Sequence, residues 1–416
     1  MKLVWLCNMT PGVVSRCRGT GGGGLWLDHV LDDLCTRQDI SVRLFCPGGT
    51  EEGQVDGKTS YVLFTEGAPQ DYRQQLEELF YGQLLDFQPD VIHIWGTEYG
   101  HTLAMVNAAQ RLGWENRVVI SIQGLCSSCA RHYCEGIPEA VCHRYSLRDF
   151  LKRDNLLGQQ RQFARRGALE RQTLEKVGHV IGRTDFDRAV TGQINPHRRY
   201  HFCNETLREG FYQDVWRYSG CKKHRIFLSS ALFPFKGAHY LLEAMPLVLA
   251  EFPDAEIVVT GDSFFKSTLP EKLRQDYYHR YLARLADKND LGDKIHFLGA
   301  LNEQQMKQAF LDCNVFVLPS TIENSPNSLG EAMLLGVPCV AADVGGVSNM
   351  LHPGQGYVYQ STAPYMLAHY ITEVFRQQER AEEMGAQARL QALETHNPEK
   401  NMKDLLEIYR LIAEER

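Results

Sequence analysis

Residues 316–346 read FVLPSTIENSPNSLGEAMLLGVPCVAADVGG and contain the strongest structural pattern in the chain. The apolar run that ends at Pro319 predicts a buried strand, and a polar loop rich in turn residues follows it. A helix is predicted from about Ser328 to Gly336, because glycine is a common residue just past a helix end. The next apolar run, Cys339–Ala342, predicts another strand. A strand, a loop, a helix and a strand in this order indicate a βαβ unit of a parallel sheet.

Two acidic residues, Glu323 and Glu331, lie eight positions apart in this stretch, one before the loop and one in the first helical turns. The start of a helix offers free backbone N–H groups and a positive dipole end, which suit a diphosphate. A carboxylate on each side can accept hydrogen bonds from sugar or ribose hydroxyls. The alternative is a first-turn helix acid and a solvated loop charge, since two glutamates at this spacing often occur by chance.

Short apolar runs alternate with helical patterns along nearly the whole chain. The predicted strands are Leu3–Cys7, Val42–Cys46, Tyr61–Phe64, Val91–Trp95, Val118–Ile122, Val180–Gly182, Ile226–Ser230, Glu256–Thr260, Lys294–Leu298, Val315–Pro319 and Cys339–Ala342. The predicted helices are Leu25–Leu34, Tyr72–Leu85, Thr102–Leu112, Leu156–Val177, Ala238–Glu251, Glu271–Lys288, Glu303–Asp312 and Leu329–Leu335, with a helical tail from Tyr365. This alternation predicts an α/β fold of parallel sheets with helices on both faces.

A chain of 416 residues is too long for one ordinary core, so two doubly wound domains are expected. The weakly periodic segment Asp214–Arg225 marks the predicted junction. We expect an N-terminal Rossmann-like domain over residues 1–215 and a C-terminal one over 222–385. C-terminal helices over 386–416 are expected to return to the first domain. Two such domains would face each other across a cleft, where the carboxyl ends of open α/β sheets bind ligands.

The bulk composition excludes several classes of protein. The chain is 44% hydrophobic and 23% charged with a formal net charge of −7, so a broad nucleic-acid-binding surface is not expected. The apolar run near the N-terminus, Leu3–Cys7, is too short for a signal peptide and lacks a cleavage site after it. No run approaches the length of a transmembrane helix. We therefore expect a cytoplasmic protein, with contact at the inner face of the membrane left open.

Twelve cysteines are expected to be reduced thiols in that compartment. Four of them cluster, at Cys126, Cys129, Cys134 and Cys142. The opening C-x2-C spacing is compatible with zinc, but the later spacings fit no familiar zinc module. We favour a group of thiols that line a loop over a metal site.

The segment Phe316–Gly346 closely resembles the Glu-x7-Glu signature of family-four retaining glycosyltransferases, whose fold is GT-B. The resemblance continues in the strand and turn at Ile295–Leu301 and in Ser229–Met245, which contains a Lys236–Gly237 pair typical of the family's phosphate-binding segment. Together these segments cover most of residues 225–350. The first half is similar more loosely, through a glycine run followed by a helix and through the DVIHIWG motif.

The resemblance implies roles for named residues. Glu323 would contact donor-sugar hydroxyls near the reacting carbon, and Lys236 would neutralise the diphosphate. Glu331 would hold the ribose. The other implied donor-binding residues are the backbone amides of Ser328 and Leu329, the loop glycines Gly23 and Gly24, and Ser230, Gly261 and Ala300.

The sequence departs from the family pattern at two places. The family's arginine beside the diphosphate is replaced by Ser229–Ser230, and Lys222, Lys223, Arg225 or Lys266 would have to substitute for it. The family's histidine beside the donor sugar is replaced by Gln123–Gly124, and a glutamine does not titrate near neutral pH.

The nearby His93 alternates with Val91 and Trp95, which favours a hydrogen-bonded core histidine over a ligand. Gln123, Trp95 and Glu98 follow or end strands and are candidate acceptor or sugar contacts.

Asp185-Phe186-Asp187 spells the D-x-D sequence by which another glycosyltransferase fold binds a divalent metal. Thr184 or Asp185 as a helix N-cap explains this sequence without a metal. Arg183 and Arg188, beside it, are compatible with either a ligand site or a solvated helix face.

The resemblance implies a metal-independent, retaining transfer of a hexosyl group from a nucleoside-diphosphate sugar to an acceptor hydroxyl, in polysaccharide or glycolipid biosynthesis. No cofactor is expected beyond the donor, and a saccharide or lipid-linked molecule is the expected acceptor. The alternatives are a non-catalytic nucleotide-sugar-binding protein and another GT-B enzyme, such as a sugar-nucleotide epimerase or a phosphorylase.

Overall fold

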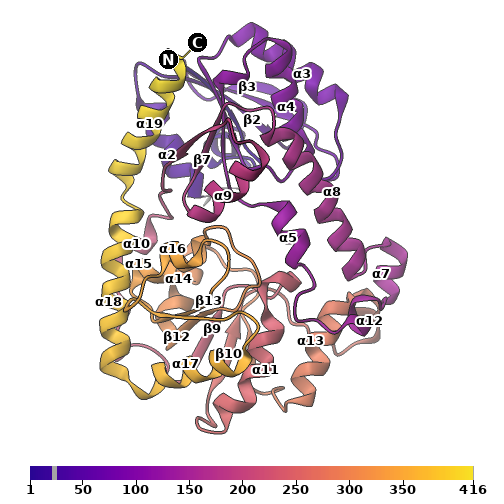
Figure 1. The fold of residues 1–416 in the computed structure, drawn as a ribbon, viewed down its shortest axis with the longest axis vertical. Coiled ribbons are helices and arrows are strands. Elements are labelled where there is room, and N and C mark those ends of the chain that lie inside the picture. Colours follow the sequence, from indigo (N-terminus) through magenta and orange to yellow (C-terminus); the bar gives the residue numbers. More distant parts are fainter. Residues whose placement is uncertain (21–25, 416) are drawn as a thin grey trace. The chain divides into compact units, whose positions relative to one another are not determined.

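The computed structural model describes residues 1–20 and 26–415, and the contacts of the chain divide into two compact units (Figure 1). Unit 1 comprises Met1–Ser128, Gln162–Arg208 and His396–Arg416. Unit 2 comprises Cys129–Arg161 and Glu209–Thr395. Each unit contains one sheet with helices packed against it, which confirms the predicted α/β class.

The sheet of unit 1 has the strand order β3-β4-β2-β1-β5-β6-β7-β8. Every pair of neighbours is parallel except β3 with β4. The strands are β1 (Lys2–Leu6), β2 (Ser41–Pro47), β3 (Glu52–Gln54), β4 (Thr59–Phe64), β5 (Val91–Trp95), β6 (Val118–Ser121), β7 (His179–Gly182) and β8 (Arg199–Phe202). The order turns back between β1 and β5, so the carboxyl ends of these two strands form the ligand-binding position of a doubly wound sheet.

Side chains of successive strand residues alternate between two cores, as the pleat of a strand requires. Leu3 and Trp5 face a core shared with α1 (Gly12–Cys17), α2 (Trp26–Thr36) and α19 (Pro398–Glu414). Val4 and Leu6 face a core on the other side of the sheet. The helices of that side are α3 (Gln74–Phe87), α4 (Gly100–Arg111), α8 (Leu156–Leu174) and α9 (Asp185–Ile194). Tyr409 ties α19 to the sheet, because its hydroxyl lies 3.0 Å from the indole nitrogen of Trp5.

The sheet of unit 2 is parallel throughout and has the order β11-β10-β9-β12-β13-β14. In chain order this is 3-2-1-4-5-6, the arrangement of a Rossmann sheet. The strands are β9 (Arg225–Leu228), β10 (Glu256–Val259), β11 (Ile295–Phe297), β12 (Val315–Leu318), β13 (Cys339–Ala342) and β14 (Tyr357–Tyr359). The order turns back between β9 and β12, so their carboxyl ends define the corresponding position in unit 2.

The longer helices of unit 2 are α11 (Ala238–Leu249), α13 (Tyr277–Lys288), α14 (Glu303–Asp312), α15 (Asn327–Leu335), α17 (Pro364–Arg376) and α18 (Gln378–Thr395). The shorter ones are α6 (Glu139–Cys142), α7 (Leu147–Lys152), α10 (Gly210–Gln213), α12 (Leu269–Arg274), α16 (Val347–Met350) and the 3-10 turn η2 (Pro234–Lys236). The turn η1 (Glu115–Arg117) belongs to unit 1, and the short helix α5 (Cys126–His132) begins in unit 1 and ends in unit 2. No helix of the described residues is long and apolar enough to cross a membrane.

All eleven predicted strands are present within two residues of their expected limits, but three short strands, β3, β8 and β14, were not expected. One predicted helix, Glu271–Lys288, is wrong because the chain breaks it into α12 and α13. Gln275 adopts an extended conformation at the break, and Asp276 caps α13 by accepting a hydrogen bond from the His279 amide at 3.0 Å.

The contacts also differ from the domain limits expected from the sequence. Residues 129–161 belong to unit 2, although the expected first domain ran continuously over 1–215. The expected junction Asp214–Arg225 lies within unit 2, where the Trp216 indole donates to the Cys313 carbonyl at 2.7 Å. Within the expected C-terminal group 386–416, α18 lies in unit 2 and α19 in unit 1.

Candidate active site

In unit 2, an ion pair joins the two segments that follow the carboxyl ends of β9 and β12. The Lys236 ammonium is 2.6 Å from Oε1 of Glu323, and the Ser320 hydroxyl donates to the same oxygen at 2.7 Å. Glu323 is largely buried, whereas the Lys236 side chain is about one-third exposed. The two charges come from segments 87 positions apart and meet because β9 and β12 are neighbours in the sheet.

Two glycines allow these segments to approach so closely. Gly237 has φ +71°, and a Cβ there would lie 1.8 Å from the Pro319 carbonyl oxygen. Gly345 has φ +54°, and a Cβ there would lie 1.7 Å from the carbonyl oxygen of Glu323. The Gly346 amide donates to that same carbonyl at 3.1 Å. Only glycine fits at these two positions, because any Cβ would collide with a backbone carbonyl oxygen. Close packing therefore explains the glycine of the Lys-Gly pair and that of the VAADVGG motif.

Helix α15 follows this loop and begins at Asn327 after Pro326, which makes no side-chain cap. Ser328 is half-buried in its first turn. The Leu329 amide donates a hydrogen bond to the Pro326 carbonyl at 3.0 Å. Glu331 lies buried one turn further on. Glu323 and Glu331 are thus both buried, at the loop and at the start of the helix that follows it.

The other donor-binding candidates of unit 2 lie at the same edge of the sheet. Ser230 follows β9, and its hydroxyl accepts from the Leu232 amide at 3.2 Å. Gly261 follows β10 with φ +92°, and its amide donates to the Gly299 carbonyl at 2.8 Å. Ala300 is exposed beside that contact. The backbone after β10 is therefore joined to the backbone after β11 through two glycines.

Three of the four cations considered as substitutes for the family's arginine are placed elsewhere. Arg225 begins β9, at the amino end of the strand, and pairs with Glu256. Lys222 and Lys223 precede it, so they share that opposite edge. Lys266 follows the carboxyl end of β10, and it contributes to lowering the pKa of Glu271 after the hydrogen bonds from Thr268.

In unit 1, Gly23 and Gly24 lie outside the described residues, whereas the other candidates lie where β5 and β6 end. The Asn8 amide group, directly after β1, donates to the Trp95 carbonyl at 2.8 Å and lies 3.4 Å from Oε2 of Glu98. The Asn8 side-chain oxygen lies 2.8 Å from Nε2 of His101. The side chains of Asn8, Glu98 and His101 thus form one polar group at the position where the strand order turns back.

Glu98 supplies the carboxyl group of these three residues. Burial raises the pKa of Glu98 to about 7, and the nearby Glu170 raises it further while Arg166 opposes the rise. Arg166 donates to the Glu98 backbone carbonyl at 2.7 Å. Glu170 itself is fully buried and caps α5, because it accepts from the Cys126 amide at 2.7 Å and from the Ser127 hydroxyl at 2.5 Å. A carboxyl group that titrates near neutrality can accept or donate a proton there.

Gln123 belongs to a second polar group of unit 1. Its amide donates to Glu205 at 2.5 Å, and Glu205 pairs with Arg183 at 3.1 Å. Arg183 directly follows β7, and both charged side chains are buried, so Arg183 does not lie on a solvated helix face. Trp95 is also buried. Its ring stacks on His93 with centroids 4.1 Å apart, which places it in the core rather than on an open surface.

Two interpretations made from the sequence are confirmed. His93 is a core residue, with its ring nitrogens 2.5 Å from the Tyr409 hydroxyl and 2.8 Å from the Ser121 hydroxyl, and burial lowers its pKa to about 3. Thr184 caps α9 by accepting from the Asp187 amide at 3.1 Å. Asp187 is buried and accepts from the Arg183 amide, which accounts for the D-x-D sequence as a helix start.

The four clustered cysteines lie on and after α5. Within residues 1–20 and 26–415, no three histidine, cysteine or acidic side chains are grouped closely enough to hold a metal ion. Cys134 and Cys142 hydrogen-bond to each other, and this contact lowers the pKa of Cys142. None of the four is part of a disulfide bond.

Five residues of these polar groups were not predicted from the sequence: Ser320, Asn8, His101, Arg166 and Glu205. Asn8, Ser320 and Glu205 each follow a strand within three residues, so polar residues just past predicted strand ends were the available signal. β8 itself was not predicted, so Glu205 had no strand to be assigned to. Arg166 lies inside a long polar helix, where no local pattern distinguishes it from its neighbours.

Two doubly wound α/β units are the architecture of the GT-B fold, which solved structures of glycosyltransferases share. The sucrose-phosphate synthase from Thermosynechococcus elongatus aligns over 100% of both chains with a TM-score of 0.70 at 15% identity. HepE from Anabaena, in complex with UDP and glucose, aligns over 98% of this chain and 99% of its own with a TM-score of 0.66 at 17% identity. At these identities the likeness concerns the fold.

A match to a known protein family covers part of the chain. Residues 219–391 match the family described as Glycosyl transferases group 1, a span that contains the whole sheet of unit 2 together with Lys236, Glu323 and Glu331. A GDP-mannose-dependent monoacylated alpha-(1-6)-phosphatidylinositol monomannoside mannosyltransferase from Corynebacterium glutamicum is 30% identical over 171 residues, which are 39% of this chain and 41% of that protein. The chain spans less than half of the length of the curated relatives it matches.

Proposed function

We propose that this chain is a glycosyltransferase that moves a sugar from a nucleoside-diphosphate sugar to an acceptor hydroxyl, with retention of the anomeric configuration and without a metal. The observation that carries the proposal is the pair of Lys236 and Glu323 in front of α15, inside the span that matches the family. A cation and a helix start together suit a diphosphate. Two buried carboxylates in the same segment suit hydroxyls.

In this proposal the ion pair is exchanged when the donor binds. The diphosphate takes the Lys236 ammonium, which is partly exposed, and Glu323 turns to the sugar hydroxyls with Ser320 still bonded to it. Glu331 holds the ribose. As the bond from the anomeric carbon to the leaving phosphate breaks, Lys236 and the start of α15 stabilise the negative charge that grows on the diphosphate. The acceptor oxygen bonds to the anomeric carbon, and its proton passes to the leaving phosphate.

Acceptor recognition is assigned to unit 1, at the carboxyl ends of β1, β5 and β6. Glu98 and Asn8 present hydrogen-bonding atoms there, and Gln123 follows β6 in a second polar group with Glu205. Trp95 contributes as a buried support of this region. A lipid-linked saccharide or a glycolipid is the proposed acceptor class, because the mannosyltransferase relative is named for a phosphatidylinositol mannoside substrate. Polysaccharide or glycolipid biosynthesis is therefore the proposed context.

A transfer assay tests the proposal. The full chain is first screened by thermal shift against uridine, guanosine, adenosine, cytidine and thymidine diphosphate sugars, because a ligand at 100 times its Kd adds about 2.7 kcal/mol of stability. The donor that binds is then incubated with saccharide and lipid-linked acceptors in the presence of EDTA. We expect the nucleoside diphosphate and a product of unchanged anomeric configuration by NMR. An inverted product contradicts retention, loss of activity in EDTA contradicts metal independence, and binding without transfer supports the non-catalytic alternative.

A further inference from the structure

Two six-residue helices of unit 2, α7 and α12, contact each other and lie side by side (Figure 1). Neither contributes an apolar side chain to the core. Helix α12 has no buried residue, and the one buried residue of α7 is Asp149. A helix packed on a domain normally turns an apolar face inward. Packing in the core therefore does not explain the apolar residues of these two helices.

The polarity of α7 is inverted. Leu147, Phe150 and Leu151 occupy positions i, i+3 and i+4 and so share one face of the helix. Phe150 is 70% exposed and Leu151 is 72% exposed, whereas the carboxylate residue Asp149 is 1% exposed. The apolar face of α7 thus points to solvent and its acidic residue points inward.

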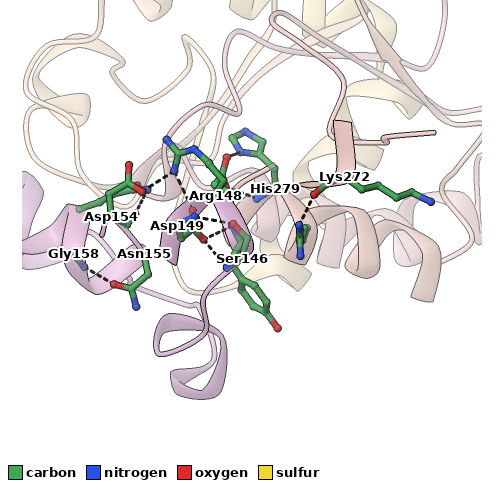
Figure 2. Close-up of polar contacts among 12 residues, drawn as sticks. Ser146, Arg148, Asp149, Asp154, Asn155, Gly158, Lys272 and His279 are labelled. Carbon is green, nitrogen blue, oxygen red and sulfur yellow. Dashed lines mark hydrogen bonds and ion pairs between the residues drawn. The ribbon is translucent and has the colours of Figure 1, made fainter. Parts of the chain in front are cut away.

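Polar contacts hold α7 in this orientation (Figure 2). Asp149 forms a capping box with Ser146 and also accepts from the Tyr277 amide, at the start of α13, at 2.9 Å. Arg148 donates to both Asp149 and Asp154, at 3.0 and 2.9 Å. The outward direction of Phe150 and Leu151 is therefore fixed by an ion-pair and hydrogen-bond network on the opposite side.

Helix α12 presents apolar residues in the same way. Leu269 and Leu273 lie at positions i and i+4, and Leu269 is 70% exposed. A capping box between Thr268 and Glu271 holds the start of the helix, and Arg280 of α13 donates to the Lys272 carbonyl. We define the α7/α12 surface as the exposed apolar residues of these helices and the tyrosine before them: Tyr145, Leu147, Phe150, Leu151, Leu269 and Leu273.

The charges around this surface are mostly positive. Residues 143–153 and 266–274 together contain seven Lys and Arg residues and two acidic ones, although the whole chain has a net charge of −7. One acid, Asp149, is buried against Arg148, and the other, Glu271, caps α12. Lys152, Arg153, Lys272 and Arg274 are all exposed. An apolar patch with a local positive charge is therefore carried by an otherwise acidic chain.

We propose that the α7/α12 surface docks on an anionic lipid bilayer, with Phe150, Leu151 and Leu269 entering the headgroup region. Exposed aromatic and leucine side chains flanked by Lys and Arg have the composition of interfacial membrane anchors. A second copy of the chain is the less suitable occupant, because two copies meeting here would bring like charges together. This inference depends on the exposure and charge of two helices and not on the transferase function.

Vesicle co-sedimentation of the full chain tests the proposal, with phosphatidylcholine vesicles prepared with and without phosphatidylglycerol. We expect binding to the anionic vesicles that weakens as salt increases. The double variant Phe150→Ser/Leu151→Ser should lower the partition coefficient about tenfold or more. Lys152→Gln/Arg153→Gln should lower it about fivefold per charge removed. The matched control, Leu247→Ser/Leu390→Ser, replaces two exposed leucines elsewhere in unit 2 and should bind like the wild type.

Several results would overturn the proposal: no sedimentation of the wild type with anionic vesicles, or equal binding by Phe150→Ser/Leu151→Ser. A wild-type dimer in sedimentation velocity that this double variant abolishes would assign the surface to a second copy instead. Both residues of the double variant are exposed, so its thermal midpoint should equal that of the wild type. If it does not fold, the Lys152→Gln/Arg153→Gln variant and the salt dependence decide the outcome. None of these variants touches Lys236 or Glu323, so a failure here leaves the proposed function untouched.

Discussion

The Lys236 ammonium and the Glu323 carboxylate form a 2.6 Å ion pair, although the two residues are 87 positions apart in the chain. The pair is set by the order of the sheet, because β9 and β12 are neighbours and both segments continue past the carboxyl ends of these strands. Ser320 fixes the carboxylate, whereas Lys236 remains partly exposed. A partly exposed cation can exchange its carboxylate partner for a ligand phosphate.

Replacing Lys236 by alanine should lower kcat/KM for the donor about tenfold or more, which corresponds to about 1.4 kcal/mol of lost transition-state stabilisation. The reason is the loss of the charge that faces the growing negative charge on the diphosphate. Steady-state kinetics measures the effect. The matched control is Lys223→Ala, an exposed lysine before the amino end of β9, which should leave the kinetics unchanged. Wild-type kinetics in the Lys236 variant would remove the lysine from the site.

Replacing Glu331 by alanine should weaken donor binding and reduce turnover about tenfold or more, because a buried carboxylate that accepts from two ribose hydroxyls is lost. The effect should be larger for a nucleoside diphosphate than for inorganic diphosphate, which has no ribose. Calorimetric titration of both ligands separates these cases. Glu379→Ala, in the exposed first turn of α18, is the control. An equal loss of affinity for the two ligands would contradict the assigned contact.

The Gly237→Ala substitution should destabilise unit 2 more than the Gly354→Ala substitution does. Both glycines have positive φ, +71° and +87°, so both variants incur a backbone strain of about 1–2 kcal/mol. The Gly237 Cβ would in addition lie 1.8 Å from the Pro319 carbonyl oxygen, whereas the Gly354 Cβ meets nothing within 4 Å. Urea unfolding gives the difference. Equal free energies of unfolding for the two variants would mean that the approach of these two segments is not constrained.

The stability contributed by Glu98 should decrease as pH rises. Burial raises its pKa from 4.5 to about 7, so between these values the folded chain keeps a proton that the unfolded chain releases. The free energy of unfolding therefore decreases as pH rises through this window, and the stability linked to the Glu98 proton is fully present only below pH 4.5. Glu98→Gln cannot ionise, so its free energy of unfolding relative to the wild type should be more favourable at pH 8 than at pH 5.

Urea unfolding of wild type and variant at the two pH values measures this change. The control Glu78→Gln should show little change between the two pH values, because hydrogen bonds from Arg111 lower the pKa of Glu78 below 4.5 and its carboxyl group is ionised in both the folded and the unfolded chain across this range. A Glu98→Gln variant whose relative stability does not change with pH would contradict the raised pKa.

The fold could be predicted largely because the strands of both sheets are short continuous apolar runs, which is typical of buried parallel sheets. Two of the three strands that were missed lack such a run. β8 has the sequence RYHF and lies at a sheet edge, and β3 is a three-residue antiparallel edge strand. The break between α12 and α13 was missed because the helical pattern continues through it, and only the cap at Asp276 ends it.

The candidate site of unit 2 could be located because its residues lie in one motif and in one Lys-Gly pair. What could not be predicted is which charges meet, since the contact of Lys236 with Glu323 depends on strand order. The same limit applies to Gln123, Glu205 and Arg183, which follow three different strands. The exposure of Phe150 could not be predicted either, because the composition of its helix is ordinary. The apolar face of α7 points to solvent only because Asp149, on the opposite side, is buried.

The central claim is that Lys236 and its neighbours bind a nucleoside diphosphate. Titration calorimetry of the full chain with UDP, GDP, ADP, CDP and dTDP, in EDTA, tests it most directly when repeated on Lys236→Ala. We predict that at least one of the five binds the wild type. The variant should bind the same ligand at least about tenfold more weakly. Binding of none of the five, or equal binding by wild type and variant, would contradict the claim.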